Sequence, residues 1–275
     1  MRNARKLAVS GAAIVATAVV FLIPFAFILV NAMKDEQQAA RLDFALPTTF
    51  RIWENLVEVV TTRNWMLLKA FLNSAILTVG SVTLLVIVSA MVGFVLQRRK
   101  TRWNGLINFL ILAGLMMPPA VVPTIWLLQS LGLFATLHGL ILIEVAYHMS
   151  FCILLYRAFI ATIPRELDEA AIIDGAKPLD VFFRVVLPLL WPVTVTNIVV
   201  QTVSIFNDFT NPLYYAPGAS NATVQLTLYN FVSQFDTAYN LLFMNILLIT
   251  IPPLVVFLFF NRQIVAGMTA GAVKG

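Results

Sequence analysis

Residues 167–176 read Leu-Asp-Glu-Ala-Ala-Ile-Ile-Asp-Gly-Ala, and Leu187-Pro188 opens the apolar run that follows. This polar, helix-favouring segment stands between two long apolar runs. A chain that places a structured element in one connecting loop is expected to use that loop to contact something. The identity of that partner then bears directly on function.

The local sequence predicts helix, tight turn and helix. Pro164 can open the first helix, with Thr162 as a nearby cap. Residues 165–174 are good helix formers without glycine, and Gly175 can adopt the left-handed conformation that ends a helix. Pro178 can start a second short helix.

The first helix offers a surface for a partner. Ala170 and Ala171 make one side small, which permits close approach, and Glu169 and Asp174 add negative charge that a basic partner could meet. A solvated amphipathic linker is the alternative.

Composition indicates a polytopic membrane protein. The 275 residues are 60% hydrophobic and 11% charged, which is too apolar for a soluble domain. Runs long enough to cross a bilayer have to be helical, because unpaired backbone groups are costly in lipid. We therefore predict an all-α membrane protein with six spans. They are 7–33, 70–96, 105–129, 139–160, 188–210 and 241–260.

Lysine and arginine predict the orientation. With the N-terminus inside, thirteen of the 18 basic residues fall on the inner side and five on the outer side. The positive-inside rule then places both termini and the Asp174-Gly175 loop in the cytoplasm. The first run could be mistaken for a signal peptide, but its apolar core is too long and an uncleaved span is favoured.

Two outer loops and several prolines are informative. The loop at about 34–69 contains Trp53 and Trp65 and indicates an interfacial segment, whereas that at about 211–240 is turn-rich. Prolines in two of the spans are expected to kink or interrupt helices. These prolines are Pro118, Pro119, Pro123, Pro252 and Pro253. They are either ordinary transmembrane prolines or the cause of bends that let the helices move.

Polar residues in two spans are candidates for a solute pathway. A helical stripe in the fifth span consists of Thr194, Asn197, Gln201, Ser204 and Asp208. Such a stripe should face protein or water, so it either forms interhelical hydrogen bonds or lines a path.

In the fourth span, Glu144 and His148 lie four residues apart on one face. They form either a structural pair or a substrate contact.

At the loop, the chain resembles permease subunits of bacterial ABC importers. That family carries Glu-Ala-Ala, three residues, Gly, nine residues and Ile-x-Leu-Pro. The match here is Glu169-Ala170-Ala171, Gly175 and Val185-x-Leu187-Pro188, with one conservative difference.

The resemblance extends over nearly the whole chain to the carbohydrate (maltose-type) branch. One departure is His148-Met-Ser-Phe151, where that branch commonly has Pro-Phe. This difference weakens the case for assigning a substrate contact of that branch to these positions. The supporting segments are Asn73-Ser74, Gly132-Leu133, Gly139-Leu140-Ile141, Phe206-Asn207-Asp208-Phe209, Pro212-Leu213 and residues 267–275.

This resemblance implies a type I importer permease fold, with residues 1–275 as one transmembrane domain in the bacterial inner membrane. The loop at about 161–187 would dock its helix on a cytoplasmic ATPase through Glu169, Ala170, Ala171, Asp174, Gly175, Leu187 and Pro188. The tail at about 261–275 would reach the ATPase through Gly271 and Lys274.

The implied partners are a second, similar permease, two ATPase subunits, a solute-binding protein, a sugar-like solute and membrane lipid, without nucleic acid. The chain has no phosphate-binding Gly-x4-Gly-Lys-Ser/Thr loop, so ATP and Mg are expected in the ATPase and no cofactor or metal in this chain.

Three alternatives are open. One is an ABC permease for another class of solute, against which the C-terminal tail argues. Another is a proton-coupled transporter that uses Glu144 and His148, which leaves the 169–188 loop unexplained. A membrane enzyme is disfavoured, because His138 and His148 are the only histidines and no catalytic motif is present.

Overall fold

The chain is predominantly helical in a computed structural model that describes residues 2–233 and 237–272. In these ranges the only β pairing is an isolated bridge between Val232 and Thr237. Lipid supplies no hydrogen bonds, so each backbone segment that crosses it satisfies its own polar groups within a helix. The predicted all-α class is confirmed.

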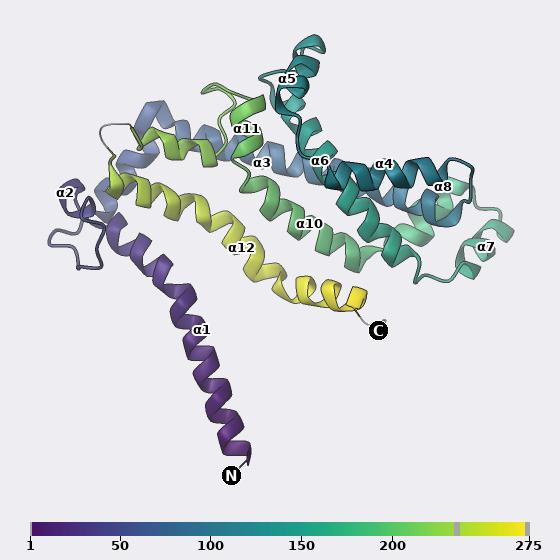
Figure 1. The fold of residues 1–275 in the computed structure, drawn as a ribbon, viewed down its shortest axis with the longest axis horizontal. Coiled ribbons are helices and arrows are strands. Elements are labelled where there is room, and N and C mark those ends of the chain that lie inside the picture. The colour runs from purple at the N-terminus through teal and green to yellow at the C-terminus, as the bar shows by residue number, and fades with distance from the viewer. Residues whose placement is uncertain (1, 234–236, 273–275) are drawn as a thin grey trace. The chain divides into compact units, whose positions relative to one another are not determined.

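The helices vary from single turns to long rods (Figure 1). Among them η1 is a π-helix and η2 is a 3-10 helix. In chain order the elements are α1 (Arg2–Ala32), α2 (Glu36–Ala39), α3 (Ile52–Arg98), α4 (Asn104–Met116), α5 (Val121–Ser130), α6 (Leu137–Ile160), α7 (Glu166–Ile173), α8 (Pro178–Asp180), η1 (Val181–Val186), α9 (Leu187–Leu189), α10 (Trp191–Phe206), α11 (Thr210–Tyr215), η2 (Gln225–Asn230) and α12 (Tyr239–Ala272).

Within the described ranges, four helices are long and apolar enough to cross a membrane, namely α1, α3, α6 and α12. Two further pairs of helices pass the same test together but are bent. The bend is 114° between α4 and α5, and 75° between the segment Pro178–Leu189 and α10. If each bent pair crosses once, the six predicted spans are all accounted for.

The third predicted span, 105–129, consists of two helices, which confirms the prediction that its prolines kink or interrupt it. Helix α4 ends at Met116, Met117 is extended, and α5 begins at Val121. Pro118 and Pro119 fill this break, because neither has an N–H to continue the helical ladder. Pro252 and Pro253, in contrast, lie inside the continuous helix α12.

The second predicted span, 70–96, lies within the part of α3 that follows an internal break. Helix α3 starts at Ile52 and not at residue 70, so much of the expected outer loop is helical. Its early part is interrupted where Arg63, Asn64 and Trp65 adopt positive φ angles of 49°, 57° and 61°. Left-handed backbone is unfavourable for side chains with a Cβ, so this is a strained corner.

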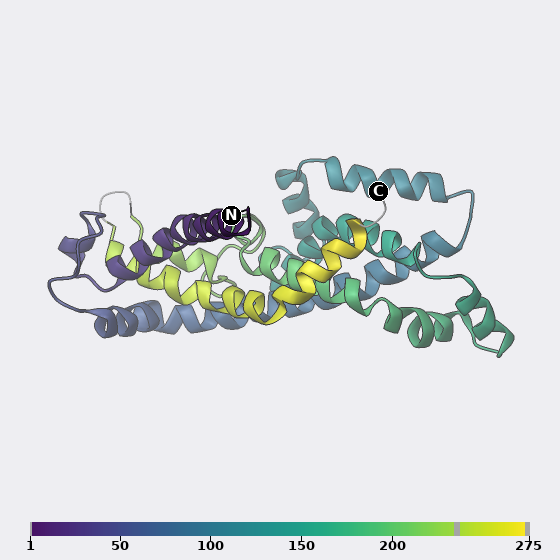
Figure 2. The same ribbon diagram turned by 90° about the horizontal axis from the view of Figure 1, so that it is seen from below.

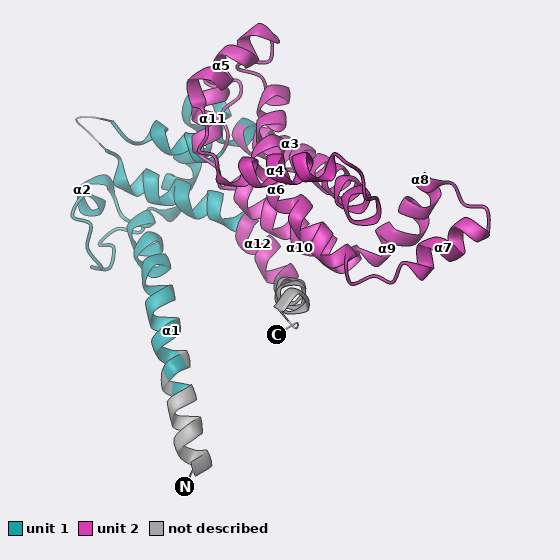
Figure 3. Ribbon diagram, turned by 45° about the vertical axis from the view of Figure 1, so that its right-hand side comes forward, with its two compact units in different colours: residues 1–69, 224–251 teal, residues 70–223, 252–275 magenta. Residues whose placement is uncertain are grey.

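The chain forms two compact units, coloured separately in Figure 3. Unit 1 contains residues 1–69 and 224–251, and unit 2 contains residues 70–223 and 252–275. Helices α3 and α12 each pass from one unit into the other. The expectation of a single domain stays a prediction.

Helix α6 is central to unit 2, where it packs against α4, α10 and α11; Figure 2 gives a second view of these helices. The Tyr156 side chain is fully buried, and its hydroxyl donates to Thr194 Oγ1 of α10 at 3.1 Å. Arg157 Nη1 donates to Asn108 Oδ1 of α4 at 2.6 Å. Close packing together with these hydrogen bonds therefore fixes α6 against α10 and α4.

The start of α6 leaves no space at Gly139. A Cβ there would collide with the Leu133 carbonyl oxygen, which belongs to backbone and cannot move aside cheaply. We predict that Gly139→Ala destabilises the purified protein by about 1–3 kcal/mol, as overpacking typically does. Gly105→Ala is the control, since nothing lies within 4 Å of a Cβ at that helical position. Thermal unfolding in detergent should separate the two variants, and equal melting temperatures would contradict the steric account.

Candidate functional site

Helix α7, in the loop between α6 and α10, is anchored to the end of α3. Arg98 Nε lies 2.6 Å from Asp168 Oδ2, and these side chains are only 10% and 11% exposed. Arg98 Nη2 also donates to the Ile163 carbonyl at 3.1 Å, and Arg165 Nη2 donates to the Gln97 carbonyl at 3.1 Å. The position of α7 is therefore set by α3, a predicted membrane span.

The start of α7 differs in detail from the prediction. The helix expected over 165–174 is observed at Glu166–Ile173. The expectation that Thr162 caps it is wrong, because the Thr162 hydroxyl donates to the Phe159 carbonyl at 2.8 Å. Arg165 occupies the cap position without a side-chain cap bond. The acidic first turn, which includes Glu166, complements the positive end of the helix dipole instead.

The end of α7 is the predicted glycine turn. Gly175 has a φ of +87°, in the left-handed region that glycine favours. Its N–H donates to the Ile172 carbonyl at 3.0 Å, and the Ala176 N–H donates to the Ala171 carbonyl at 2.9 Å. This pair of bonds is the Schellman motif.

The outward side of α7 is exposed and mixed in character. Ala171 alone of the Glu-Ala-Ala residues is partly buried, where it packs on the cluster that includes Tyr156 and Val181. Ile172 and Ile173 are 59% and 85% exposed. Large apolar side chains left in solvent on a fixed helix are typical of a contact surface. The exposed predicted residues are Glu169, Ala170, Asp174 and Gly175.

A cleft of about 240 Å³ lies between α7, α8 and the end of α3. Phe94 and Val181 contribute apolar wall, while Arg99, Arg165 and Glu169 bring charge to it. The cleft could accept a partner side chain that has an apolar stem and a charged end.

The second half of the loop leads into α10. Pro178 begins α8 as predicted, after an extended Lys177. The π-helix η1 follows, and π-turns are frequent at functional sites. Leu187 is partly buried against the α7 cluster, whereas Pro188 is exposed. The 75° bend falls at Leu190, between α9 and α10.

The C-terminal tail contributes two more residues to the predicted ATPase contact. Gly271 lies in the last turn of α12. Lys274 lies outside the described residues. The contact of this tail with an ATPase stays a prediction.

The residues of the predicted polar stripe on α10 differ in burial. Thr194, Asn197 and Gln201 are buried, the last two beside the Tyr156 hydroxyl and the Cys152 thiol of α6. The arrangement therefore favours interhelical contact for these three over direct exposure to a path. Asp208 is partly exposed beyond the end of the helix, and Ser204 is exposed.

The buried polar groups of α10 are incompletely paired. Asn197 Oδ1 and Nδ2 and Gln201 Oε1 have no hydrogen-bond partner of good geometry within the described part of the chain. Buried amides without partners are costly, so water or a bound polar molecule is the expected complement.

Glu144 is fully buried in α6 and surrounded by polar groups of unit 2. His148 Nε2 lies 3.4 Å from Glu144 Oε2, and Asn211 Nδ2 donates to Glu144 Oε1 at 3.2 Å. Asp208 is a further neighbour of Glu144. The His148 side chain is 25% exposed, so it is the accessible member of the pair. No group of three or more acidic, His or Cys side chains suited to a metal occurs among the described residues.

Comparison with known proteins identifies the family. Residues 85–270 match the model of the binding-protein-dependent transport system inner membrane component. The chain belongs to this family. The resemblance inferred from the loop motif and the expected permease fold are thereby confirmed, and the protein is a membrane component of a transport system.

Individual relatives of this permease agree over nearly its whole length. It is 31% identical over 268 residues to the melibiose/raffinose/stachyose import permease protein of Bacillus subtilis, covering 96% of this chain and 95% of that one. It is 33% identical over 257 residues to a probable starch degradation products transport system permease protein of Thermoanaerobacterium thermosulfurigenes, covering 92% of each. In fold it is similar to a chain in the crystal structure of a bacterial ABC transporter that imports alginate, with a TM-score of 0.81 at 20% identity, covering 95% of this chain and 98% of that one.

Sequence reasoning missed the groups that position the permease loops. Asp168 stands directly before the recognised Glu169, and only its burial against Arg98 reveals its role. Arg98 was counted merely as an orientation charge. In unit 1, Lys34 and Asp43 form a 2.7 Å pair that no motif signalled. The Arg98–Asp168 pair joins residues far apart in the chain, and a single sequence carries no signal for it.

The Arg98–Asp168 pair can be tested by removing its carboxylate. We predict that Asp168→Ala loosens α7, because breaking a mostly buried pair costs about 3 kcal/mol and leaves Arg98 uncompensated. Hydrogen exchange of residues 166–173 in lipid nanodiscs should rise at least tenfold.

The control for this test is Asp180→Ala, which breaks the exposed Arg184–Asp180 pair at 3.4 Å. Such surface pairs contribute about 0–1 kcal/mol, so exchange in α7 should scarcely change. Equal exchange in both variants would show that the Arg98–Asp168 pair does not hold α7.

Proposed function

We propose that this chain is the permease subunit of an ATP-driven importer that moves a sugar or sugar-like solute into the cytoplasm. The observation that carries the coupling part is α7 itself, which Arg98 and Asp168 fix to α3 and whose Glu169 and Ala170 are exposed. The choice of a sugar rests on relatives named for melibiose, raffinose, stachyose and starch products.

In this proposal α7 is the coupling helix of an ATPase subunit. Movement of the ATPase would push α7, and the Arg98–Asp168 pair would pass that movement to α3 because it resists separation. The cleft beside Glu169 would accept a side chain of the ATPase. Gly271 and Lys274 are proposed as further contacts of the tail with the ATPase.

The other subunits of the proposed importer would supply the functions that this chain lacks. ATP and Mg would be bound by two ATPase subunits, a second permease would complete the pathway, and an extracytoplasmic binding protein would deliver the solute. Thirteen of 18 basic residues fall on one side, which supports an inner-membrane topology with α7 and both termini in the cytoplasm.

Solute recognition is proposed for the polar groups of α6 and α10. His148 and Ser204 are accessible, whereas Glu144, Asn197 and Gln201 lie behind them in the helix packing. Asp208 borders the same region beside Glu144. Hydroxyl, amide and imidazole groups suit the hydrogen-bonding surface of a sugar.

The coupling role can be tested at Gly175. We predict that Gly175→Pro lowers both uptake and capture of the ATPase subunit at least tenfold, because proline forbids the positive φ and removes the bond to Ile172. Radiolabelled uptake in cells and co-purification from their membranes provide the two readouts.

A matched control exists at Gly132, which ends α5 with a φ of +69° and donates its N–H to the Gln129 carbonyl at 3.1 Å. Gly132→Pro imposes the same local strain in a different loop, so ATPase capture should persist. Loss of capture in both variants, or in neither, would contradict a specific role for α7.

Glu144 provides the test of solute recognition. Glu144→Gln retains a carbonyl that can accept from Asn211, so we expect an assembled complex. Replacement of the carboxyl oxygen beside His148 by an amide NH₂ group should change the relative uptake of different sugars by about tenfold, as altered pairing of a buried polar group does. Competition assays with a sugar panel measure this preference. An unchanged order of preference, or loss of assembly alone, would assign Glu144 a purely structural role.

A further inference from the structure

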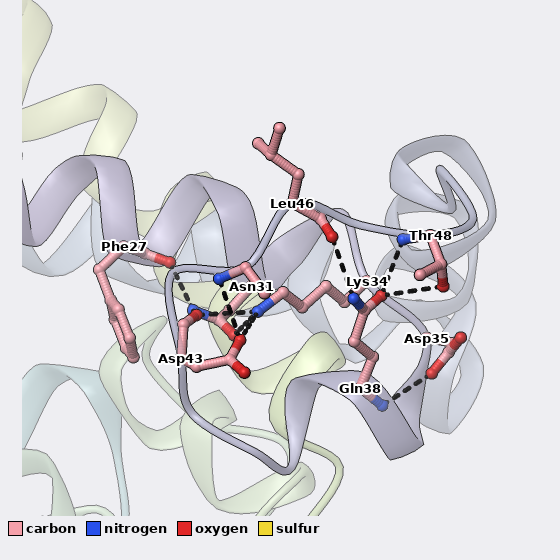
Figure 4. Close-up of polar contacts among 9 residues, drawn as sticks. Phe27, Asn31, Lys34, Asp35, Gln38, Asp43, Leu46 and Thr48 are labelled. Carbon is pink, nitrogen blue, oxygen red and sulfur yellow. Dashed lines mark hydrogen bonds and ion pairs between the residues drawn. The ribbon is translucent and has the colours of Figure 1, made fainter.

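The loop that connects α1 to α3 has a polar interior. Lys34 is fully buried, and its ammonium donates to Asn31 Oδ1 at 3.0 Å, to the Asp43 carbonyl at 2.8 Å and to Asp43 Oδ1 at 2.7 Å (Figure 4). This bond from Lys34 holds the pKa of the Asp43 carboxyl below its usual value. The loop is thus closed by charge and hydrogen bonds.

A second set of bonds fixes the same loop. Gln38 Nε2 donates to the Leu46 carbonyl at 3.0 Å, and Gln38 Oε1 accepts from the Thr48 N–H at 3.0 Å. Asp35 Oδ1 accepts from the Gln38 N–H at 2.8 Å, which caps α2. These bonds hold the loop in shape without burying its large apolar side chains.

Those apolar side chains lie on the outside. Leu46 is 77% exposed, Phe50 and Trp53 are each 68% exposed, Phe44 is 55% exposed and Leu42 is 44% exposed. A water-exposed loop usually has the opposite arrangement, so a surface of this kind marks an interaction site. We call residues 42–53 the outer wedge.

Contacts within unit 1 place the wedge level with the end of α1. The ring centroids of Phe44 and Phe27 are 5.0 Å apart, and Asn31 Nδ2 donates to the Asp43 carbonyl at 3.2 Å. Phe27 precedes Ala32, the last residue of α1, by five positions, which is roughly 7 to 8 Å along a helix. The wedge therefore folds back beside the last turns of an apolar span.

The other end of the wedge is fixed at the same level. The Arg51 N–H donates to the Met33 carbonyl at 2.9 Å. Asn55 Nδ2 donates to the Ala32 carbonyl at 2.8 Å. Trp53 thus lies beside the end of α1, where aromatic residues gather at membrane surfaces.

We propose that the outer wedge inserts into the headgroup region of the bilayer, so that its partner is membrane lipid. An interfacial segment typically reaches about 5–10 Å below the headgroups, which agrees with its depth along α1. The wedge continues the apolar surface of α1, whose residues Val15–Ala32 are nearly all outside the packed interior of the described chain. Exposed Arg41 and Arg51 beside the wedge are suited to lipid phosphates.

The depth of the wedge in the bilayer explains why Asp43 is paired with Lys34. The Asp43 backbone lies beside Asn31, inside the level of the span, where an unpaired carboxylate is expensive. Pairing with Lys34 neutralises that charge while the apolar neighbours Leu42 and Phe44 remain free for lipid. The proposal concerns anchoring and is independent of which solute is carried.

Spin labels can measure the depth of the wedge in the assembled importer. Cys152 is the only cysteine, so a Cys152→Ala background accepts single labels at Leu46→Cys and Phe50→Cys. Val19→Cys in α1 is the lipid reference, and Gln37→Cys, exposed in α2, is the aqueous reference. The measurement is the ratio of collisions with oxygen to those with a water-soluble nickel chelate, in nanodiscs of phosphatidylethanolamine and phosphatidylglycerol.

We expect the oxygen-to-nickel ratio at both wedge positions to exceed that at Gln37 at least threefold and to approach that at Val19. A ratio equal to that at Gln37 would refute insertion. Shielding from nickel that appears only after the solute-binding protein is added would also refute it, because the wedge would then be a protein contact.

The ion pair has its own matched test. Asp43→Asn should lower the ratio at Leu46 at least twofold, because a neutral amide oxygen accepts from Lys34 more weakly than a carboxylate and leaves the buried ammonium without a counter-charge. Glu36→Gln makes the same charge change at an exposed site in α2 and should leave the ratio unchanged. Unchanged depth in Asp43→Asn, with the complex assembled, would refute the role of the pair in holding the wedge.

Discussion

Lipid offers no hydrogen bonds to a backbone, and the rest of this structure depends on that constraint. Each long apolar segment is helical because a helix satisfies its own N–H and C=O groups. Breaks occur where the sequence removes a donor, as at Pro118 and Pro119, or where a polar loop begins, as after Ile160. The positions of the breaks then decide which segments can project from the helices and meet other molecules.

A projecting loop transmits force only if it is fixed to a span. Arg98 provides this for α7, because its guanidinium pairs with Asp168 and also donates to the Ile163 carbonyl. In unit 1, Lys34 fixes the outer loop to the end of α1 by the same kind of chemistry. In both loops, charged side chains pair with each other on the inner side, and the outer face remains available for a partner.

The fold was predictable to the extent that its causes are local. Apolar length predicts spans, and Gly175 predicts a left-handed helix end because few other residues adopt that conformation. Proline alone does not decide whether a helix breaks, because Pro118 and Pro119 fall at a break whereas α12 continues through Pro252 and Pro253. Nor does it give the angle, since the 114° turn between α4 and α5 depends on what each half packs against. The pairing of Asp168 with Arg98 joins residues far apart in the chain. A single sequence carries no signal for it, and the same is true of the buried state of Lys34.

The polar stripe of α10 shows why periodicity alone does not define a pathway. Spacing correctly placed Thr194, Asn197 and Gln201 on one face, but it could not say whether that face met a helix or water. Because they are buried against α6, a solute would contact them directly only if α6 and α10 separated. The unpaired amide atoms of Asn197 and Gln201 carry a desolvation cost that helix packing alone does not repay. A buried polar site that is stabilised when a polar molecule enters would fit the solute pathway proposed for these helices.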